Sequence, residues 1–94
     1  MYMVNKGRIS VTEFVEDRLE SVGKTQRQVA EEAGFDYPNV VSMMKQGKMK
    51  VPLNRIRGLA KALEADPVQL LRLVLEDHYP ELWESVWEIT QGGA

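Results

Sequence analysis

Hydrophobic and small residues recur every three or four positions along the chain, and residues typical of helix ends separate these stretches. In the first stretch, Ser10 and Glu13 have the spacing of a capping box, and Gly23 suits the end of a helix. The apolar positions between them, which share one side of a helix, are Val11, Phe14, Val15, Leu19 and Val22. The pattern therefore predicts a first helix between Ser10 and Gly23.

Residues 25–46, TQRQVAEEAGFDYPNVVSMMKQ, predict two short helices joined by a tight turn. Thr25 and Gln28 form a second capping-box pattern, so the first of these helices should begin near Gln26. Its inward positions are Val29, Ala30 and Ala33. Ala30 is small enough for another helix to cross close to it, and Gly34 is expected to end the helix in the left-handed conformation.

The second helix of this segment is expected over residues 38–46, with Asp36 as its N-cap and Pro38 in its first turn. Val40 and Met43 lie three residues apart and are expected to face inward. The positions left on the outer side are Tyr37, Asn39, Val41, Ser42 and Lys45.

The rest of the chain also has helical periodicity, without the alternation of apolar and polar residues that is typical of strands. A fourth helix is expected to begin at Pro52, and a fifth at Asp66 and Pro67. Their inward positions are Ile56, Leu59, Ala60 and Leu63, followed by Leu70, Leu71 and Val74. A last helix over residues 80–90 completes an all-α chain, and 94 residues with 44% hydrophobic content suit one compact domain.

The spacing of Ala30, Gly34 and Val40 resembles that of the Cro/C1-type helix-turn-helix family, which is also called the XRE or phage lambda repressor-like family. Residues 53–71, LNRIRGLAKALEADPVQLL, are similar to the fourth helix, turn and fifth helix of that family. The resemblance implies a compact five- to six-helix lambda repressor-like DNA-binding domain over residues 1–78. Residues 79–94 would then form a C-terminal helix that packs on this domain or makes a dimer interface. The resemblance also implies that Gln26 contacts the DNA backbone, with Thr25 and Arg27 beside it.

The net charge of −2 conceals an uneven distribution. Residues 1–57 carry ten Lys or Arg against seven Asp or Glu, whereas residues 58–94 carry two against seven. Five cations follow one another without an acid between them: Lys45, Lys48, Lys50, Arg55 and Arg57. Such a run is often only a solvated surface, but its position beside residues 25–46 favours contact with a phosphate backbone.

A helix over residues 38–46 would enter the major groove of double-stranded DNA. Asn39 can pair with adenine, and Ser42 can donate or accept a hydrogen bond. Val41 or Tyr37 can touch a thymine methyl group, and Lys45 can reach guanine or a phosphate. Contacts with the DNA backbone are assigned to Lys48, Lys50 and Arg55 in addition to Thr25, Gln26 and Arg27.

The last helix carries two tryptophans four residues apart, which therefore share one face. This face either covers the core of the domain or forms a homodimer interface made by Leu82, Trp83, Val86 and Trp87. A two-fold dimer implies an inverted-repeat operator with half-sites about one helical turn apart.

Motifs for catalysis and metal binding are missing from the sequence. There is no cysteine, and His78, which we expect at the surface, cannot make a zinc site alone. We therefore expect no enzyme activity, no cofactor and no small-molecule substrate. Without a signal peptide or an apolar segment long enough to span a membrane, the expected location is the cytoplasm. Residues 1–8 are expected to be disordered or to form a flexible arm.

Two functions remain open at this point. The favoured one is a sequence-specific DNA-binding transcriptional regulator, a small repressor. The alternative is a helix-turn-helix adaptor that binds another protein, which the overall acidity and the two tryptophans would suit.

Overall fold

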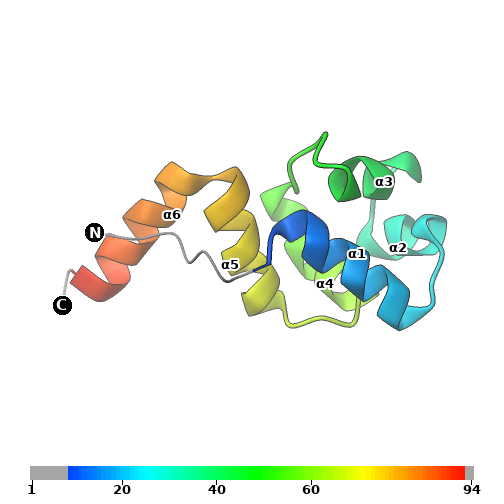
Figure 1. Ribbon diagram of the computed structural model, residues 1–94, viewed down its shortest axis with the longest axis horizontal. Helices are drawn as coiled ribbons and strands as arrows, with labels where there is room; N and C mark the ends of the chain where they lie inside the picture. The colour runs from blue at the N-terminus through cyan, green and yellow to red at the C-terminus, as the bar shows by residue number, and fades with distance from the viewer. Residues whose placement is uncertain (1–8, 93–94) are drawn as a thin grey trace.

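Six α-helices make up most of residues 9–92, which are the residues that the computed structural model describes (Figure 1). The helices are α1 (Val11–Val22), α2 (Gln26–Ala33), α3 (Asn39–Lys45), α4 (Ile56–Ala62), α5 (Pro67–His78) and α6 (Pro80–Trp87). A 3-10 helix, η1 (Leu53–Arg55), precedes α4, and a π-helix, η2 (Glu88–Gly92), follows α6. No strand occurs in residues 9–92, so the predicted all-α architecture is confirmed. The arm expected at residues 1–8 lies outside the described residues.

The predicted capping boxes begin the first two helices. The Ser10 hydroxyl accepts from the Glu13 amide at 3.2 Å, and the Glu13 carboxylate accepts from the Ser10 amide at 3.1 Å. The hydrogen bonds that the Ser10 amide and then the Ser10 hydroxyl donate to the Glu13 carboxylate lower the pKa of Glu13. Thr25 and Gln28 make the same pair of bonds at 3.0 and 2.9 Å. Gly34 ends α2 with φ of 88°, a left-handed conformation that favours glycine.

The hydrophobic core lies between α1, α2, α3, α4 and α5. Its largest fully buried side chains include Met44, Leu59, Leu63 and Leu70. In Figure 1, α6 extends from one end of this body, next to α5, and the described chain measures 42 × 25 × 22 Å along its principal axes. None of the residues of α6 is buried.

Arg18 and Lys24 donate hydrogen bonds to the carbonyl groups at the C-terminal end of α4. This end has no glycine to take the left-handed conformation. Glu64 takes the left-handed conformation there, with φ of 53°. The Arg18 guanidinium donates to the carbonyl oxygens of Leu63 and Glu64, each at 3.1 Å. Lys24 donates to the Ala62 carbonyl and to the Glu32 carboxylate, each at 2.8 Å, and the bond to Glu32 raises the pKa of Lys24. These bonds satisfy carbonyl groups that a helix end leaves open.

Three details of the sequence prediction are wrong. Asp36 does not cap α3, because Pro38 precedes the helix without any side-chain cap. Leu71 is 40% exposed, and Leu73 is buried in its place on α5. The fourth helix is also divided: Pro52 begins the 3-10 turn η1, and the α-helix starts only at Ile56.

We expect Gly58→Ala to lower the free energy of unfolding by about 1–3 kcal/mol, because it overpacks the contact between α2 and α4. A Cβ atom at Gly58 would lie 2.7 Å from the carbonyl oxygen of Ala33, which is backbone and cannot turn away. Urea denaturation followed by circular dichroism measures the change. Arg57→Ala, at an exposed neighbour on α4, serves as the control and should have little effect. A stabilising effect of Gly58→Ala, as helix propensity alone would give, would contradict the close approach.

Candidate nucleic-acid interface

The turn between α2 and α3, residues 34–38, determines how α3 lies on the body. The Phe35 amide donates to the Ala30 carbonyl at 2.9 Å, and the Gly34 amide donates to the Glu31 carbonyl at 3.1 Å. Phe35 is half-buried against the core, and Ala30 is buried at 1% exposure. These bonds use the open carbonyls of α2 and reverse the chain within a few residues. As a result, α3 packs against both α2 and α1.

The outer side of α3 carries four residues that lie three or four positions apart: Asn39, Ser42, Met43 and Gln46. We call this set the polar face of α3. The Asn39 amide nitrogen lies 3.8 Å from the Met43 sulfur, and the Gln46 amide nitrogen donates to the Ser42 hydroxyl at 3.2 Å. Asn39 and Gln46 are exposed, and the other two are partly exposed. Tyr37, just before the helix, is 68% exposed.

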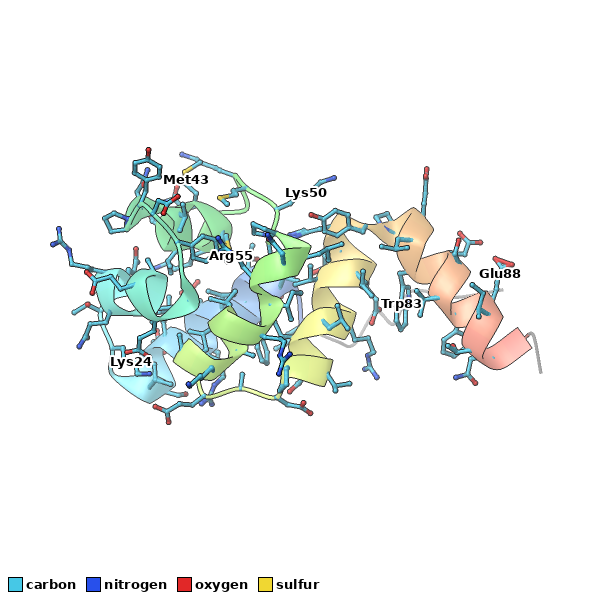
Figure 2. The ribbon with its side chains drawn as sticks, turned by 180° about the vertical axis from the view of Figure 1, so that it is seen from behind. Lys24, Met43, Lys50, Arg55, Trp83 and Glu88 are labelled. Carbon is cyan, nitrogen blue, oxygen red and sulfur yellow. The ribbon has the colours of Figure 1, made fainter. Side chains whose placement is uncertain are left out.

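Sequence reasoning placed part of α3 on the wrong side. Val41 was expected to face DNA, but it is 0% exposed and belongs to the core. Val40, Val41 and Met44 share the inward side, since they lie within three or four residues of one another. Met43 then falls toward the outer side, and Figure 2 shows it at the edge of the molecule. Met43 and Gln46 were missed, although their spacing from Asn39 indicates the same face.

The cations near α3 are spread over more than one surface. Residues 37–62 contain six Lys or Arg and no Asp or Glu. Lys48 and Lys50 are exposed in the basic loop, residues 46–52, and Lys45 is partly exposed at the end of α3. Arg55 is half-buried. Its side chain lies beside the α2–α3 turn, since a Cβ atom built at Gly34 would be 3.8 Å from the Arg55 Nε.

The other two cations of this segment, Arg57 and Lys61, lie elsewhere. They line a shallow depression with Ala65 and Pro67, beside the turn between α4 and α5. The five-residue basic run is therefore divided. Lys45 ends α3, Lys48 and Lys50 lie in the basic loop, Arg55 lies beside the α2–α3 turn, and Arg57 lies on the outer side of α4.

The three residues assigned to the DNA backbone by resemblance lie at the start of α2. The Thr25 hydroxyl accepts from the Gln28 amide, so this oxygen already serves as a cap. Gln26 is half-buried and Arg27 is exposed in the first turn of the helix. Arg27 is the only charged residue of the three, and it is exposed.

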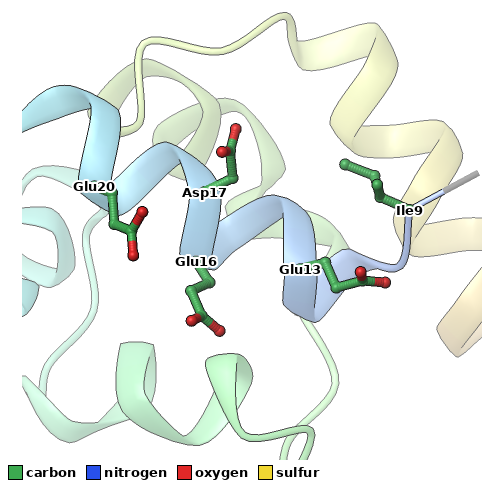
Figure 3. A pocket seen from close by; sticks show the side chains of 5 residues that line it. All are labelled: Ile9, Glu13, Glu16, Asp17 and Glu20. Carbon is green, nitrogen blue, oxygen red and sulfur yellow. The ribbon is translucent and has the colours of Figure 1, made fainter.

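Acidic residues lie along α1, on α2 and in the turn before α3. Glu13, Glu16, Asp17 and Glu20 line a shallow pocket along α1, together with Ile9 (Figure 3). Glu32 pairs with Lys24 at 2.8 Å, and Figure 2 places Lys24 at the edge opposite Met43 and Lys50. Glu31 on α2 and Asp36 in the turn are exposed.

The expected dimer residues lie on α6, where their exposure varies. Leu82 is 44% exposed, whereas Trp83, Val86 and Trp87 are partly buried. The Trp83 and Trp87 ring centroids are 6.3 Å apart with the rings tilted by 48°. Figure 2 shows Trp83 in the angle between α5 and α6. The predicted helix over residues 80–90 is α-helical only to Trp87 and continues as η2.

His78 is not the free surface residue that we expected. It is half-buried at the end of α5, and its Nδ1 accepts a hydrogen bond from the Val51 amide at 3.0 Å. Burial lowers the pKa of His78, because the charged imidazolium loses hydration. The charge of Lys50 lowers this pKa further, and Asp77 opposes both effects.

Within residues 9–92, no group of three or more His, Asp or Glu side chains is arranged to hold a metal ion. No helix in the same residues is long and apolar enough to cross a membrane. No protein-family model, curated protein or solved structure matches the chain. The function is therefore argued from the geometry and charge of the surface around α3.

Proposed function

We propose that this chain is a sequence-specific DNA-binding transcriptional regulator of the helix-turn-helix class, a small repressor that inserts α3 into the major groove. The observation that carries the proposal is the polar face of α3, with Lys45, Lys48 and Lys50 at the end of the helix and in the basic loop, and no acid in residues 37–62. The hydrogen-bonding side chains of such a helix can bind base edges in the major groove. The nearby cations can bind the phosphate backbone beside that groove.

The side chains on the polar face of α3 are suited to base edges. Asn39, at the start of the helix, has a free carbonyl acceptor and an amide donor, the pair that adenine requires. Ser42 and Gln46 hold each other at 3.2 Å, so both are oriented before DNA arrives. The thioether of Met43 and the ring of Tyr37 supply apolar contact for a thymine methyl group. Val41 takes no part, because it is buried.

The charge distribution supports phosphate contacts on the same side. Lys45 ends α3, and Lys48 and Lys50 follow in the basic loop. Each cation that contacts a phosphate releases a condensed counterion, which favours binding. Arg27 at the start of α2 is exposed and offers a further contact, with Thr25 and Gln26 next to it. The acids of α1 line a pocket that contains no residue of α3 or of the basic loop.

A homodimer is part of this proposal, since a single small domain selects its site poorly among genomic competitors. Helix α6 supports it, because it has no buried residue and packs mainly on α5. Leu82 on this helix is exposed and could contact a second copy, and Trp83, Val86 and Trp87 on the same helix are partly buried. Its acids, Glu81, Glu84 and Glu88, are exposed and would keep this end away from phosphate.

A protein-binding adaptor is the second candidate. Tyr37 is 68% exposed beside the partly exposed Met43, and tyrosine and methionine are enriched where proteins bind one another. The exposed Glu31 and Asp36 lie near this surface in sequence and would disfavour phosphate. The lack of acids in residues 37–62 weighs more, since Lys45, Lys48 and Lys50 then lie at the end of α3 and in the basic loop without an acid among them.

Selection of a randomised duplex pool at about physiological salt tests the proposal. We expect enrichment of an inverted repeat whose half-sites are about one turn apart. Asn39→Asp provides a matched variant, because it keeps the size of the side chain and replaces the amide donor by a negative charge. Retention without enrichment, or no retention, would overturn the proposal and favour the adaptor.

A further inference from the structure

Three consecutive residues at the end of α5 each bind a different group elsewhere in the chain. Asp77 accepts from the Val11 amide at 2.7 Å, His78 accepts from the Val51 amide at 3.0 Å, and the Tyr79 hydroxyl donates to the Val51 carbonyl at 3.3 Å. We call Asp77, His78 and Tyr79 the α5 clamp. Within the clamp, His78 and Tyr79 together bind the amide and the carbonyl of Val51, near the end of the basic loop.

The clamp also acts on the lysines of that loop. The Lys50 ammonium lies 5.2 Å from the centroid of the Tyr79 ring, which is a cation–π contact. Lys48 and Lys50 line a shallow depression together with Asp77 and His78. Val51 itself is 0% exposed, so the loop is anchored at one end in the core. The position of Lys50 therefore depends on the clamp, whereas the Lys48 amide is held by the Met43 carbonyl at the end of α3.

We propose that the α5 clamp positions the basic loop for DNA and that protonation of His78 releases the loop, which makes DNA binding sensitive to acid. This inference rests on the function proposed above. His78 here is a positioning residue, because it acts on phosphate contacts only through the backbone of Val51.

The chemistry of the imidazole predicts that acid breaks the bond between His78 and Val51. Because Nδ1 accepts from the Val51 amide, the hydrogen of the neutral ring is on Nε2. A second proton must then bind to Nδ1, and it removes the acceptor that holds Val51. Around the ring, Lys48 and Lys50 of the loop oppose protonation, and Asp77 on α5 and Glu81 on α6 favour it. On α1, Glu13 faces Asp77 and adds further negative charge.

Burial lowers the pKa of His78 below its ordinary value of 6.5, so the unfolded chain binds a proton before the folded one does. The folded chain therefore keeps the bond to Val51 at pH 6.5 and loses it only as the pH falls through the lowered pKa of His78. An unattached histidine near DNA would behave in the opposite way, since its added positive charge would strengthen phosphate binding.

The test compares the wild type with His78→Asn, whose side-chain oxygen can accept from Val51 at the place of Nδ1 but does not titrate. The affinity for DNA is measured against salt at about pH 7.5 and about pH 5. We expect the salt slope of the wild type to fall by about one unit in acid, for the contact of Lys50, and that of His78→Asn to stay unchanged. Both proteins carry the same carboxylates, so acid effects through those groups appear equally in both.

The Val51 amide provides a readout that does not need DNA. In the free wild type its hydrogen-exchange protection factor should fall in acid, and in His78→Asn it should persist. A wild type whose slope and Val51 protection do not change with pH, or a His78→Asn protein with the same changes, would overturn the inference. If the wild type fails to bind DNA at about pH 7.5, the proposed function fails, and acid-dependent Val51 protection still supports release of the loop.

Discussion

Val41→Asn lowers the free energy of unfolding by about 3–5 kcal/mol, because it removes an apolar side chain from the core and buries an amide without a partner. Val41 is 0% exposed, on the inward side of α3 with Met44. Urea denaturation followed by far-ultraviolet circular dichroism measures this loss as a lower midpoint. DNA affinity measured on the folded fraction should change much less, since the side chain does not reach the polar face of α3.

Tyr37→Asn is the matched control for this substitution. It introduces the same amide four residues earlier, at a side chain that is 68% exposed, and should change stability by no more than about 0.5 kcal/mol. Equal, small effects of the two substitutions would put Val41 on the surface, where the sequence alone had suggested it. The pair therefore tests the rotation of α3 about its own axis.

Local signals accounted for most of the fold. The capping boxes at Ser10 and Thr25 and the glycine at position 34 are predictable because their hydrogen bonds and φ angles involve neighbours in sequence. The pattern of α1 also gave the correct inward side, since Val11, Phe14 and Val15 are buried. A helix of seven residues such as α3 makes only two turns, so a shift of one residue changes which side is buried.

The candidate site was less predictable, because its arrangement depends on contacts between distant segments. Asn39, Ser42 and Lys45 were found from the motif, while Met43 and Gln46 needed the observed rotation of α3. The interaction of His78 with Val51 spans 27 residues, and no spacing rule indicates it. A lone histidine among acids is typical of a solvated surface, and only the packing of the basic loop against α5 makes it a structural acceptor.

Asn39→Ala and Lys48→Ala should weaken DNA binding in different ways. Loss of the Asn39 amide should cost about 1–3 kcal/mol and relax the preference at one base pair, because that side chain reads a base edge. Loss of the Lys48 charge should weaken all sequences alike and lower the salt slope by about one unit, because a lysine on phosphate carries no sequence information. Titrations of selected and random duplexes at several salt concentrations separate the two effects.

Matched controls are available within the same chain. Asn54→Ala makes the same change at an exposed position in η1, and Lys61→Ala removes an exposed lysine beside the turn between α4 and α5. Neither control should alter base preference, and Lys61→Ala should leave the salt slope nearly unchanged, since that lysine lies on the outer side of α4. If Asn39→Ala and Lys48→Ala instead weaken specific and random DNA equally, the polar face of α3 does not read bases, and the division of roles between Asn39 and Lys48 is wrong.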